Sequence, residues 1–399
     1  MFVGISNIPR PYAWGSETAI AEQLGRAPSG GPEAELWLGA HPGSPSRITE
    51  PGLVGGAADL AAWIAADPQR ALGGFAGSAR LPFLLKLLAA GSPLSLQAHP
   101  TAEQAREGFR LENEAGVPID SPERSYKDEF AKPELIYALS ERFEALCGFR
   151  PLEQFRAIVA ELAAVAEAID PELGGPIADL AQMSEADDAL PALVEWLSLG
   201  GDDVDSLIET VTVLAGRRGQ GAFEVEFATL QGLAQQYPGD PGIVISLLLN
   251  HVSLTRGEVL YLPTGNIHAY LSGLGVELMA ASDNVLRGGL TPKHVDVPEL
   301  LSVLDFDVLP VPHLEAETPE PGVSVYRPDI PDFVLVRVEG GGGYSLTGPA
   351  IALCTSGSVE IAGAASSARV ARGESVYVTP DEGRITVTGS GELFVATTG

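Results

Sequence analysis

Cysteine is scarce in this chain, and long uninterrupted hydrophobic runs are absent. Only Cys147 and Cys354 occur in 399 residues. They are too few for a disulfide framework, so a cytoplasmic protein is the default expectation. Hydrophobic residues make up 45% of the sequence, yet the apolar runs are short and are broken by residues such as Lys86 and Asn250. We therefore expect no membrane-spanning segment, and the start, MFVGISNIPRPYAWGS, does not have the pattern of a secretory signal.

Basic residues are also few. Lys and Arg number 24 against 53 Asp and Glu, which gives a net charge of −29. Nucleic acids and anionic membrane surfaces both require a basic footprint, so we expect neither as a partner. A small anionic substrate remains compatible with this charge if basic side chains gather locally. Only four of the 24 are lysines, which either mark places that need a compact ammonium group or reflect codon usage and chance: Lys86, Lys127, Lys132 and Lys293.

The apolar pattern divides the chain into parts of different texture. In residues 150–243 apolar residues recur at three- and four-residue spacing, as in FRAIVAELAAVAEAI, which predicts helices. The string YPGDPG then ends them. On either side, short runs rich in Val, Ile and Thr, such as GIVISLLLNHVSL and RITVTGSGELFVATTG, predict antiparallel strands. Length and pattern together predict three domains: residues 1–149 with 244–314, residues 150–243, and residues 315–399.

A histidine follows a turn containing Gly and Pro in GEVLYLPTGNIHAYLSG, residues 257–273. This spacing resembles the second signature of the cupins, small jelly-roll barrels in which such a turn aims the histidine, here His268, into the barrel. SLQAHP places Gln97 and His99 on one face of a strand, and AKPELIYAL places Glu134 at the start of another. Taken alone, His268 could also be a hydrogen-bonded core residue. The other histidines lack such neighbours and are expected to be structural: His41, His251, His294 and His313.

These four side chains form a ligand set of mixed type that suits Zn²⁺. Only Glu134 among them is anionic. A bound ion would therefore keep net positive charge and remain a good Lewis acid. This favours a catalytic ion over a purely structural one, since structural sites rely more on thiolates.

Several strings, taken in order along the chain, resemble type I phosphomannose isomerases, the zinc-dependent mannose-6-phosphate isomerases. They are YAWGS, ELWLGAHP, PFLLKLLAA, SLQAHP, KPELIYAL, YPGDPG, the cupin signature and GVELMAASDNVLRGGLTPKHVDVPEL. The most specific piece is ASDNVLRGGLTPK, residues 281–293. The resemblance implies a mainly β fold with a helical insertion: a catalytic cupin, a helical domain and a second cupin-like jelly roll. In that last unit Thr386 stands where a histidine ligand would lie, so we expect no metal there.

The resemblance also implies residue roles. The family's ligands for one Zn²⁺ per chain fall on Gln97, His99, Glu134 and His268. Its other active-site positions match this chain at Ser95, Lys132, Tyr270, Glu277, Asp283, Arg287 and Lys293. The implied reaction interconverts mannose 6-phosphate and fructose 6-phosphate, so the expected partner is a phosphorylated hexose, and we expect a monomer.

Such an isomerisation moves a proton between C1 and C2, most simply through a cis-enediol. It needs a cation beside the oxygen that gains charge and a positioned base. Two bases are candidates, and the sequence leaves the choice open. Lys132 lies two residues before Glu134 and so points to the side of that ligand on an extended chain. Glu277 is a lone acid in GVELMAA, which is costly to bury unless it is paired or functional.

The remaining candidates concern the phosphate. Arg287, in a Gly-rich turn, keeps its charge and can bind enediolate or phosphate, unless it is an ordinary surface arginine. Lys293 and Ser95 complete the predicted phosphate site. Asp283 is expected to orient its neighbours rather than to touch substrate.

Two other functions are compatible with a metal cupin. An Fe(II) dioxygenase would use two histidines and a carboxylate, and Gln97 together with an Arg and Lys set suited to phosphate counts against it. A non-catalytic sugar-binding cupin would lose binding or stability on metal removal but would show no turnover. Metal analysis and an assay for fructose 6-phosphate formed from mannose 6-phosphate separate the three.

Overall fold

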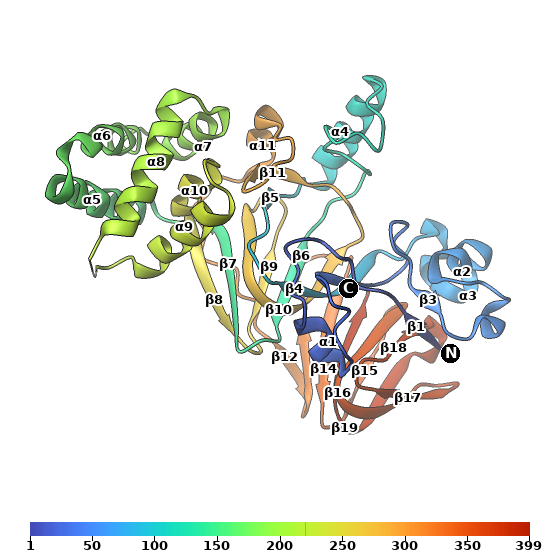
Figure 1. Ribbon diagram of the computed structural model, residues 1–399. Coiled ribbons are helices and arrows are strands. Elements are labelled where there is room, and N and C mark those ends of the chain that lie inside the picture. Colours follow the sequence, from blue (N-terminus) through green and yellow to red (C-terminus); the bar gives the residue numbers. More distant parts are fainter. Residues whose placement is uncertain (220) are drawn as a thin grey trace.

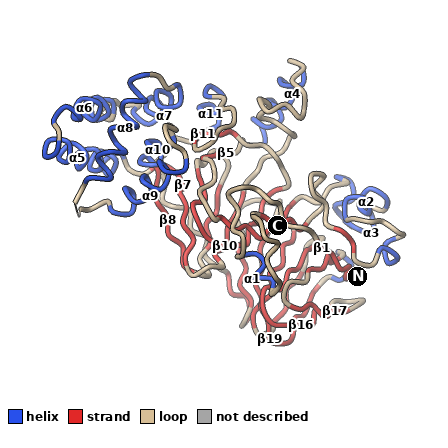
Figure 2. The backbone as a smooth tube through the Cα atoms, in the orientation of Figure 1, coloured by secondary structure: helices blue, strands red, loops and turns tan. Residues whose placement is uncertain are grey.

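Two antiparallel β-sheets and a helical insertion make up the protein in a computed structural model that describes residues 1–219 and 221–399. Strands occupy the centre of the molecule, the helices of the insertion gather at one end, and the carboxy-terminal strands lie at the other (Figures 1 and 2). The predicted fold class, mainly β with a helical insertion, is confirmed. Within the described residues no helix combines the length and the apolar character needed to cross a membrane.

The first sheet is organised around one long strand, β10, which pairs with β4, β5, β6 and β7. The sequence PFLLKLLAA forms β4, all of whose residues are buried, and Lys86 does not interrupt it. The strands of this sheet are β2 (Glu35–Leu38), β4 (Phe83–Ala90), β5 (Leu96–Ala98), β6 (Glu134–Ala138), β7 (Arg142–Phe149), β8 (Leu249–Thr255), β9 (Val259–Leu262), β10 (His268–Ala280) and β11 (Leu286–Gly289).

The second sheet is formed mainly by the carboxy-terminal strands. Its strands are β1 (Phe2–Ser6), β3 (Arg47–Ile48), β12 (Glu317–Glu320), β13 (Val323–Tyr326), β14 (Val334–Glu339), β15 (Gly342–Ser345), β16 (Ala350–Ala362), β17 (Ser367–Ala371), β18 (Ser375–Val378) and β19 (Arg384–Thr397). Strand β1 pairs with β18, and β3 pairs with β1. The sequence-based division placed residues 1–149 with the first unit, and β1 and β3 depart from it because the alternation in FVGIS does not specify which sheet edge the strand joins.

The two sheets share one hydrophobic core. Val276 and Leu278 of β10 pack in the same buried cluster as Ile351 of β16 and Phe394 of β19. Arg256, in the turn between β8 and β9, adds a polar link because its Nη2 lies 2.9 Å from Oε2 of the buried Glu392 in β19. Burial of this apolar interface fixes one unit against the other. The interior of the second unit is filled by apolar side chains, many of them valines.

The helical insertion packs its apolar stripes against each other, as the three- and four-residue spacing predicted. In α5 the buried residues include Phe155, Ile158, Leu162 and Ala166, one face of a helix. The helices of the insertion are α5 (Leu152–Ile169), α6 (Gly174–Met183), α7 (Ala189–Leu199), α8 (Asp202–Arg217), α9 (Glu224–Gln236) and α10 (Gly242–Ile245). The other α-helices are α1 (Ala19–Leu24), α2 (Leu60–Ala66), α3 (Pro68–Leu72), α4 (Ala102–Glu114) and α11 (Val297–Val303).

The first half of GIVISLLLNHVSL is helical, although the sequence predicted strand throughout this run. Gly242–Ile245 form α10, Ser246–Leu248 form a 3₁₀ turn, and β8 begins only at Leu249. All seven residues before Leu249 are buried. A continuously apolar run has no polar positions to reveal its period, so helix and strand cannot be told apart from it. Pro241 at the preceding position is compatible with the start of a helix.

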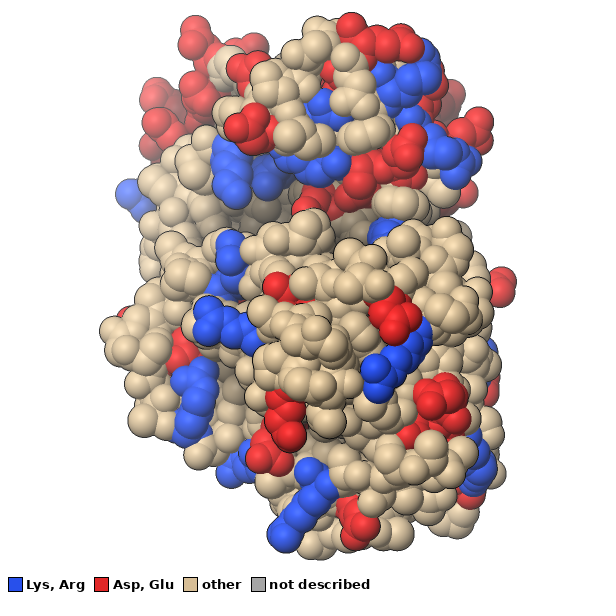
Figure 3. Space-filling model, turned by 90° about the vertical axis from the view of Figure 1, so that its right-hand side faces the viewer, with Lys and Arg blue, Asp and Glu red and all other residues tan. Residues whose placement is uncertain are grey.

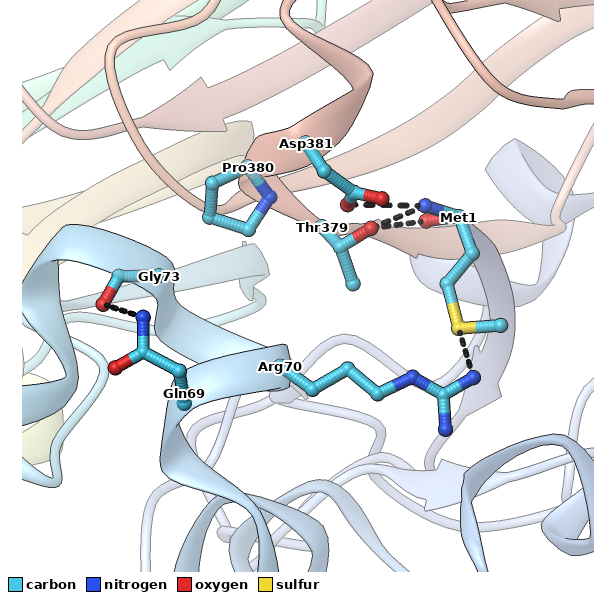
Figure 4. Close-up of a pocket in the computed structure, with 7 residues that line it drawn as sticks. All are labelled: Met1, Gln69, Arg70, Gly73, Thr379, Pro380 and Asp381. Carbon is cyan, nitrogen blue, oxygen red and sulfur yellow. Dashed lines mark hydrogen bonds and ion pairs between the residues drawn. The ribbon is translucent and has the colours of Figure 1, made fainter.

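One pocket of the molecule, remote from the predicted site residues, lies where the amino-terminal strand meets α3 and the end of β18. Figure 4 shows Thr379 and Asp381 directed at the amino group of Met1, while the side chain of Arg70 extends toward the Met1 sulfur. The amino group also lies 2.8 Å from Oε1 of Glu382, which is fully buried. These contacts hold β1 on the second sheet, and the acidic partners leave this pocket without the net positive charge that a phosphate would need.

Candidate active site and metal centre

A pocket of about 540 Å³ borders the first sheet, and most of the predicted site residues line it. The predicted residues in its wall are Ser95, Gln97, Lys132, Glu134, Tyr270, Glu277, Asp283, Arg287 and Lys293. The other two, His99 and His268, are buried and contact Glu134. Residues separated by up to about two hundred positions along the chain therefore meet at one place, and none of the eleven lies elsewhere in the molecule.

Three of the four predicted metal ligands form a compact buried cluster. His99 Nε2 lies 3.4 Å from Glu134 Oε1, and His268 Nε2 lies 3.5 Å from Glu134 Oε2. One ligand atom from each of the three lies within 4.8 Å of the others. Glu134 Oε2 and His268 Nε2 are buried and have no hydrogen-bond partner among the described residues. Buried acceptors of this kind are costly unless they bind a cation, so the cluster fits a metal ion.

Both imidazoles are oriented by their other nitrogen. His99 Nδ1 lies 2.8 Å from the carbonyl oxygen of Asn284, and His268 Nδ1 lies 3.1 Å from that of Asn266. A carbonyl can only accept, so each Nδ1 carries the proton and each Nε2 presents a lone pair toward Glu134. Backbone carbonyls commonly fix metal-ligating histidines in this way.

The electrostatics of the cluster also favour the protonation states in which these side chains can bind a metal ion. Burial, followed by the charge of Lys132, lowers the pKa of His99 to about 4, so the imidazole is neutral at pH 7. Burial alone would raise the pKa of Glu134, but Lys132 and His99 outweigh it and hold this pKa well below its usual range. Lys132 Nζ lies 2.7 Å from Glu134 Oε1, as the two-residue spacing predicted. A neutral imidazole and an ionised carboxylate are the protonation states that bind metal.

The string SDN, residues 282–284, fastens the segment that leads into β6. Asn284 donates from Nδ2 to the backbone oxygens of Asp128 and Phe130, and its Oδ1 accepts from the backbone N–H of Lys127. The hydroxyl of Ser282 donates to Asp128 Oδ1. Because the backbone carbonyl oxygen of Asn284 also accepts a hydrogen bond from His99 Nδ1, this network ties one ligand to the loop that delivers Lys132 and Glu134. The specificity of the string therefore has a physical basis.

Strand pairing places the fourth predicted ligand beside the others. Gln97 in β5 is directly opposite His268 in β10 and opposite Arg287 in β11. Side chains of residues directly opposite each other in antiparallel strands lie on the same face of the sheet. The amide of Gln97 therefore shares a row with one metal-ligand candidate and with the predicted catalytic arginine, and Gln97 lines the pocket.

A buried ion pair that the sequence did not assign lies farther along β10. Lys86 in β4 is opposite Glu277 in β10, and its Nζ lies 2.7 Å from Glu277 Oε2 and 3.7 Å from Glu35 Oε1. Both Lys86 and Glu277 line the pocket although they are largely buried. The two carboxylates raise the pKa of Lys86 against the effect of burial. Burial raises the pKa of Glu277, which Lys86 partly opposes.

Two aromatic residues of the pocket wall, Trp37 and Tyr270, lie near these buried charges. Trp37, from the ELWLGAHP string, lies opposite Lys86, and its Nε1 donates to Glu35 Oε2 at 2.7 Å. Tyr270 is buried, and its hydroxyl makes no hydrogen bond within the described residues. Burial, reinforced by Glu277, raises the pKa of Tyr270 well above its usual value, so the hydroxyl keeps its proton. Three of the four lysines of the chain, Lys86, Lys132 and Lys293, line this one pocket.

Arg287 and Lys293 supply local positive charge at the other part of the pocket wall. Burial lowers the pKa of Arg287, and burial together with Arg287 lowers the pKa of Lys293, with no carboxylate offsetting either effect within the described residues. Two cations without acidic partners are unusual in a chain with a net charge of −29. Figure 3 shows one face of the molecule. On this face Lys and Arg side chains border a hollow, although Asp and Glu side chains crowd the upper part of the molecule.

His41 has a partner that the sequence did not reveal. Its Nε2 lies 3.1 Å from Oδ2 of Asp283, a pocket residue, which is compatible with the structural role expected for His41. Its Nδ1 accepts from the backbone N–H of Gly43, so Nε2 carries the proton and donates to Asp283. The backbone N–H of Asp283 in turn donates to Asp128. Asp283 is thus held by its neighbours at the rim of the pocket.

Comparison with known proteins agrees with this geometry. Residues 3–152 match the family model described as phosphomannose isomerase type I, catalytic domain. The mannose-6-phosphate isomerase of Escherichia coli K12 is 35% identical over 395 residues, which cover 97% of each chain. The rat enzyme of the same name is 33% identical over 363 residues, or 84% of this chain and 81% of the relative.

Solved structures agree as well. A mannose 6-phosphate isomerase crystallised with zinc and yttrium superimposes with a TM-score of 0.87 at 32% identity and covers 100% of this chain and 99% of its own. The apo form of the Salmonella typhimurium enzyme superimposes with a TM-score of 0.86 at 32% identity and the same coverage. The prediction of a zinc cofactor is confirmed by the zinc-bound relative together with the His99, Glu134 and His268 cluster. The chain belongs to the family of type I phosphomannose isomerases.

Proposed function

We propose that the protein interconverts mannose 6-phosphate and fructose 6-phosphate by proton transfer between C1 and C2 through a cis-enediol. The observation that carries the proposal is the pocket itself. It combines a buried His/Glu/His cluster, a buried Lys86–Glu277 ion pair and two cations without acidic partners. A metal-binding part, a proton-transfer part and an anion-binding part are what isomerisation of a phosphorylated sugar requires.

Gln97, His99, Glu134 and His268 would hold the zinc ion, three of them through the atoms that already converge. A zinc ion bound there would supply Lewis-acid polarisation of the carbonyl and hydroxyl oxygens of the sugar, which would make the adjacent carbon-bound proton more acidic. With one anionic ligand, Glu134, the site retains net positive charge. The His99 and His268 rings are held for this task by the carbonyls of Asn284 and Asn266.

Glu277 is the better supported of the two candidate bases. Burial raises the pKa of Glu277 from its ordinary value, which moves the carboxylate toward the proton affinity that an effective base needs at neutral pH. Lys132 instead forms an ion pair with Glu134, with its Nζ 2.7 Å from Oε1, which favours a role in binding oxygen atoms of the substrate. Glu277 would take the proton from C2 and return it to C1, while the O2 hydroxyl proton passes to O1. No atom is gained or lost.

Arg287, Lys293 and Ser95 would bind the phosphate. A phosphate dianion accepts charge-assisted hydrogen bonds from guanidinium and ammonium groups, and its charge would offset both the burial and the repulsion from Arg287 that lower the pKa of Lys293. All three side chains line the same pocket as the metal cluster. Because one chain supplies every residue of the pocket, we propose that the enzyme acts as a monomer. The near absence of cysteine favours the cytoplasm.

The test is a coupled assay for fructose 6-phosphate formed from mannose 6-phosphate, together with metal analysis of the purified protein. We expect zinc at one equivalent per chain, loss of turnover on chelation, and recovery when Zn²⁺ is added. His268→Ala should lose zinc and activity, whereas His313→Ala should keep both because His313 lies outside the pocket. Iron with oxygen uptake would indicate the dioxygenase instead. A zinc-loaded protein that binds the sugar phosphate without turning it over would leave only a binding function.

A further inference from the structure

The turn formed by YPGDPG, residues 237–242, lies between α9 and α10 and touches two separate segments of the pocket wall. The hydroxyl of Tyr237 donates to the carbonyl oxygen of Pro93 at 2.7 Å, two residues before Ser95. The carboxylate of Asp240 accepts from the backbone N–H of Leu290 at 2.7 Å and from that of Thr291 at 3.1 Å. The turn thus contacts both segments that carry the proposed phosphate ligands.

The segment between Arg287 and Lys293 is strongly bent, and it packs closely against this turn. Leu290 adopts φ 55°, a left-handed conformation that is unfavourable for a residue with a side chain, and it is buried. A Cβ atom on Gly289 would lie 2.9 Å from the Cα of Gly242, and a Cβ atom on Gly242 would lie 2.8 Å from the backbone nitrogen of Leu290. Such a conformation persists only where the surroundings hold it, and Asp240 binds its backbone at two consecutive positions.

We propose that the 237–242 turn positions the phosphate site, with Asp240 as its main positioning residue. This inference rests on the proposed function, because it concerns how Arg287, Lys293 and Ser95 are brought together. Asp240 acts on the backbone of the loop. Its three hydrogen-bond partners, Leu290, Thr291 and Gly242, are all backbone N–H groups.

The inference gives the helical insertion a role in substrate binding. The last turn of the insertion would hold the loop of Arg287 and Lys293 through Asp240 and the Ser95 segment through Tyr237. Loss of either contact would let one wall of the phosphate site relax while leaving the metal ligands in place. His99 and His268 are oriented by Asn284 and Asn266, and these contacts do not involve the turn. The expected consequence is weaker binding of phosphate with little change in the chemical step.

The competing interpretation is that Asp240 only stabilises the fold. It does accept from Gly242 at 2.7 Å and so supports the start of α10. A matched control is Asp59, which caps α2 by accepting from the backbone N–H of Ala62 at 2.8 Å and lies outside the pocket. Asp59→Ala should cost stability as Asp240→Ala does, but it should leave substrate binding unchanged. The comparison separates capping from positioning.

The experiment measures kcat, KM for mannose 6-phosphate, inhibition by inorganic phosphate, and zinc content for the zinc-loaded enzyme and its variants. For Asp240→Ala we expect KM and the inhibition constant of phosphate to rise together by about tenfold, with kcat changed less than about threefold and zinc content unchanged. Asp240→Asn keeps one oxygen acceptor, so its KM and its inhibition constant for phosphate should lie between those of the unmodified enzyme and those of Asp240→Ala. Tyr237→Phe should raise both constants by about two- to fivefold, since it removes one neutral hydrogen bond.

Several outcomes would overturn the inference. Unchanged KM and phosphate inhibition in Asp240→Ala would do so, as would a fall in kcat, zinc content and melting temperature without a selective effect on phosphate. If Asp240→Ala does not fold, Asp240→Asn and Tyr237→Phe decide, and normal phosphate affinity in both refutes the idea. If the unmodified protein has no isomerase turnover, the proposed function fails. Calorimetric binding of inorganic phosphate to the unmodified protein and to Asp240→Ala then still tests the positioning role.

Discussion

Replacing Lys86 with methionine should destabilise the protein in a manner that depends on pH. Lys86 is 6% exposed, and its Nζ lies 2.7 Å from Glu277 and 3.7 Å from Glu35. Methionine has a similar length but no charge, so Lys86→Met leaves two largely buried carboxylates without their cation. Removing one partner of a buried ion pair typically costs about 3–5 kcal/mol, because the remaining charge is not compensated. The free energy of unfolding of Lys86→Met should be lower than that of the unmodified protein by an amount in this range near pH 8.

The sign of the pH dependence follows from the state of Glu277. Without Lys86, nothing opposes the effect of burial, so the pKa of Glu277 in the folded protein rises further above its unfolded value. An acid whose folded pKa is raised binds a proton more readily in the folded state. Its penalty is therefore absent below the unfolded pKa, grows as pH rises above that value, and is complete once pH exceeds the folded pKa. The loss of stability in Lys86→Met should therefore be smaller at pH 5.5 than at pH 8, by on the order of 1 kcal/mol, since each unit of difference between the folded and unfolded pKa corresponds to about 1.4 kcal/mol.

The assay is urea denaturation of the zinc-loaded protein at pH 5.5 and pH 8, for the unmodified protein, Lys86→Met, Glu277→Gln and the double variant. Lys127→Met is the control, since Lys127 lies outside the pocket and donates only to the backbone oxygens of Ile119 and Ser121. The double variant should recover most of the lost stability because an amide needs no counter-charge. The reasoning is refuted if Lys86→Met lowers the free energy of unfolding no more than Lys127→Met does, or if this loss is equal at both pH values. It is also refuted if adding Glu277→Gln to Lys86→Met recovers no stability.

Two further predictions concern other parts of the molecule. Arg287→Ala and Lys293→Ala should each raise KM for mannose 6-phosphate by about 10- to 100-fold, the equivalent of one charge-assisted hydrogen bond. The control Arg110→Ala, on the exposed face of α4, should leave KM unchanged. Steady-state kinetics measure the effect, and an unchanged KM in both pocket variants would contradict the assignment of Arg287 and Lys293 to the phosphate. Glu392→Ala should lower the free energy of unfolding by about 1–3 kcal/mol. This loss is smaller than that expected on breaking a fully buried ion pair, because Arg256 and Arg337 are partly exposed. Urea denaturation against Glu360→Ala, an exposed glutamate of β16, measures it, and equal losses would contradict the structural role of Glu392.

The metal centre could be predicted from sequence because its ligands belong to short local patterns. Gln97 and His99 are two residues apart on a strand, and His268 follows a turn whose Gly and Pro positions have a fixed geometry. Local patterns of this kind determine where a side chain points without knowledge of the rest of the fold. The resemblance to a family then added Arg287 and Lys293, whose role depends on the distant Ser95 and could not be inferred from spacing.

Lys86, His41 and Asp240 show what such patterns do not contain. In the sequence Lys86 only interrupts an apolar run, and its role depends on Glu277, which lies almost two hundred residues later and becomes its neighbour when β4 pairs with β10. His41 and Asp283 are also far apart in the sequence, and their side chains meet only in the folded chain. An unusual residue choice was the available signal for Lys86, since a lysine in a buried strand is expensive unless it is paired. The low lysine content of the chain pointed in the same direction.

The boundary of the helical insertion shows why architecture is harder to predict than chemistry, and why the two meet at Asp240. The run GIVISLLL is apolar at almost every position, so its period is hidden, and both a buried strand and a buried helix satisfy it. The structure adopts the helix because the chain must turn at residues 237–242 and then enter β8 in the correct register. That turn places the Asp240 carboxylate against Leu290 and Thr291. If substitution of Asp240 changes phosphate affinity alone, the position of this boundary is set by the needs of the active site as well as by packing.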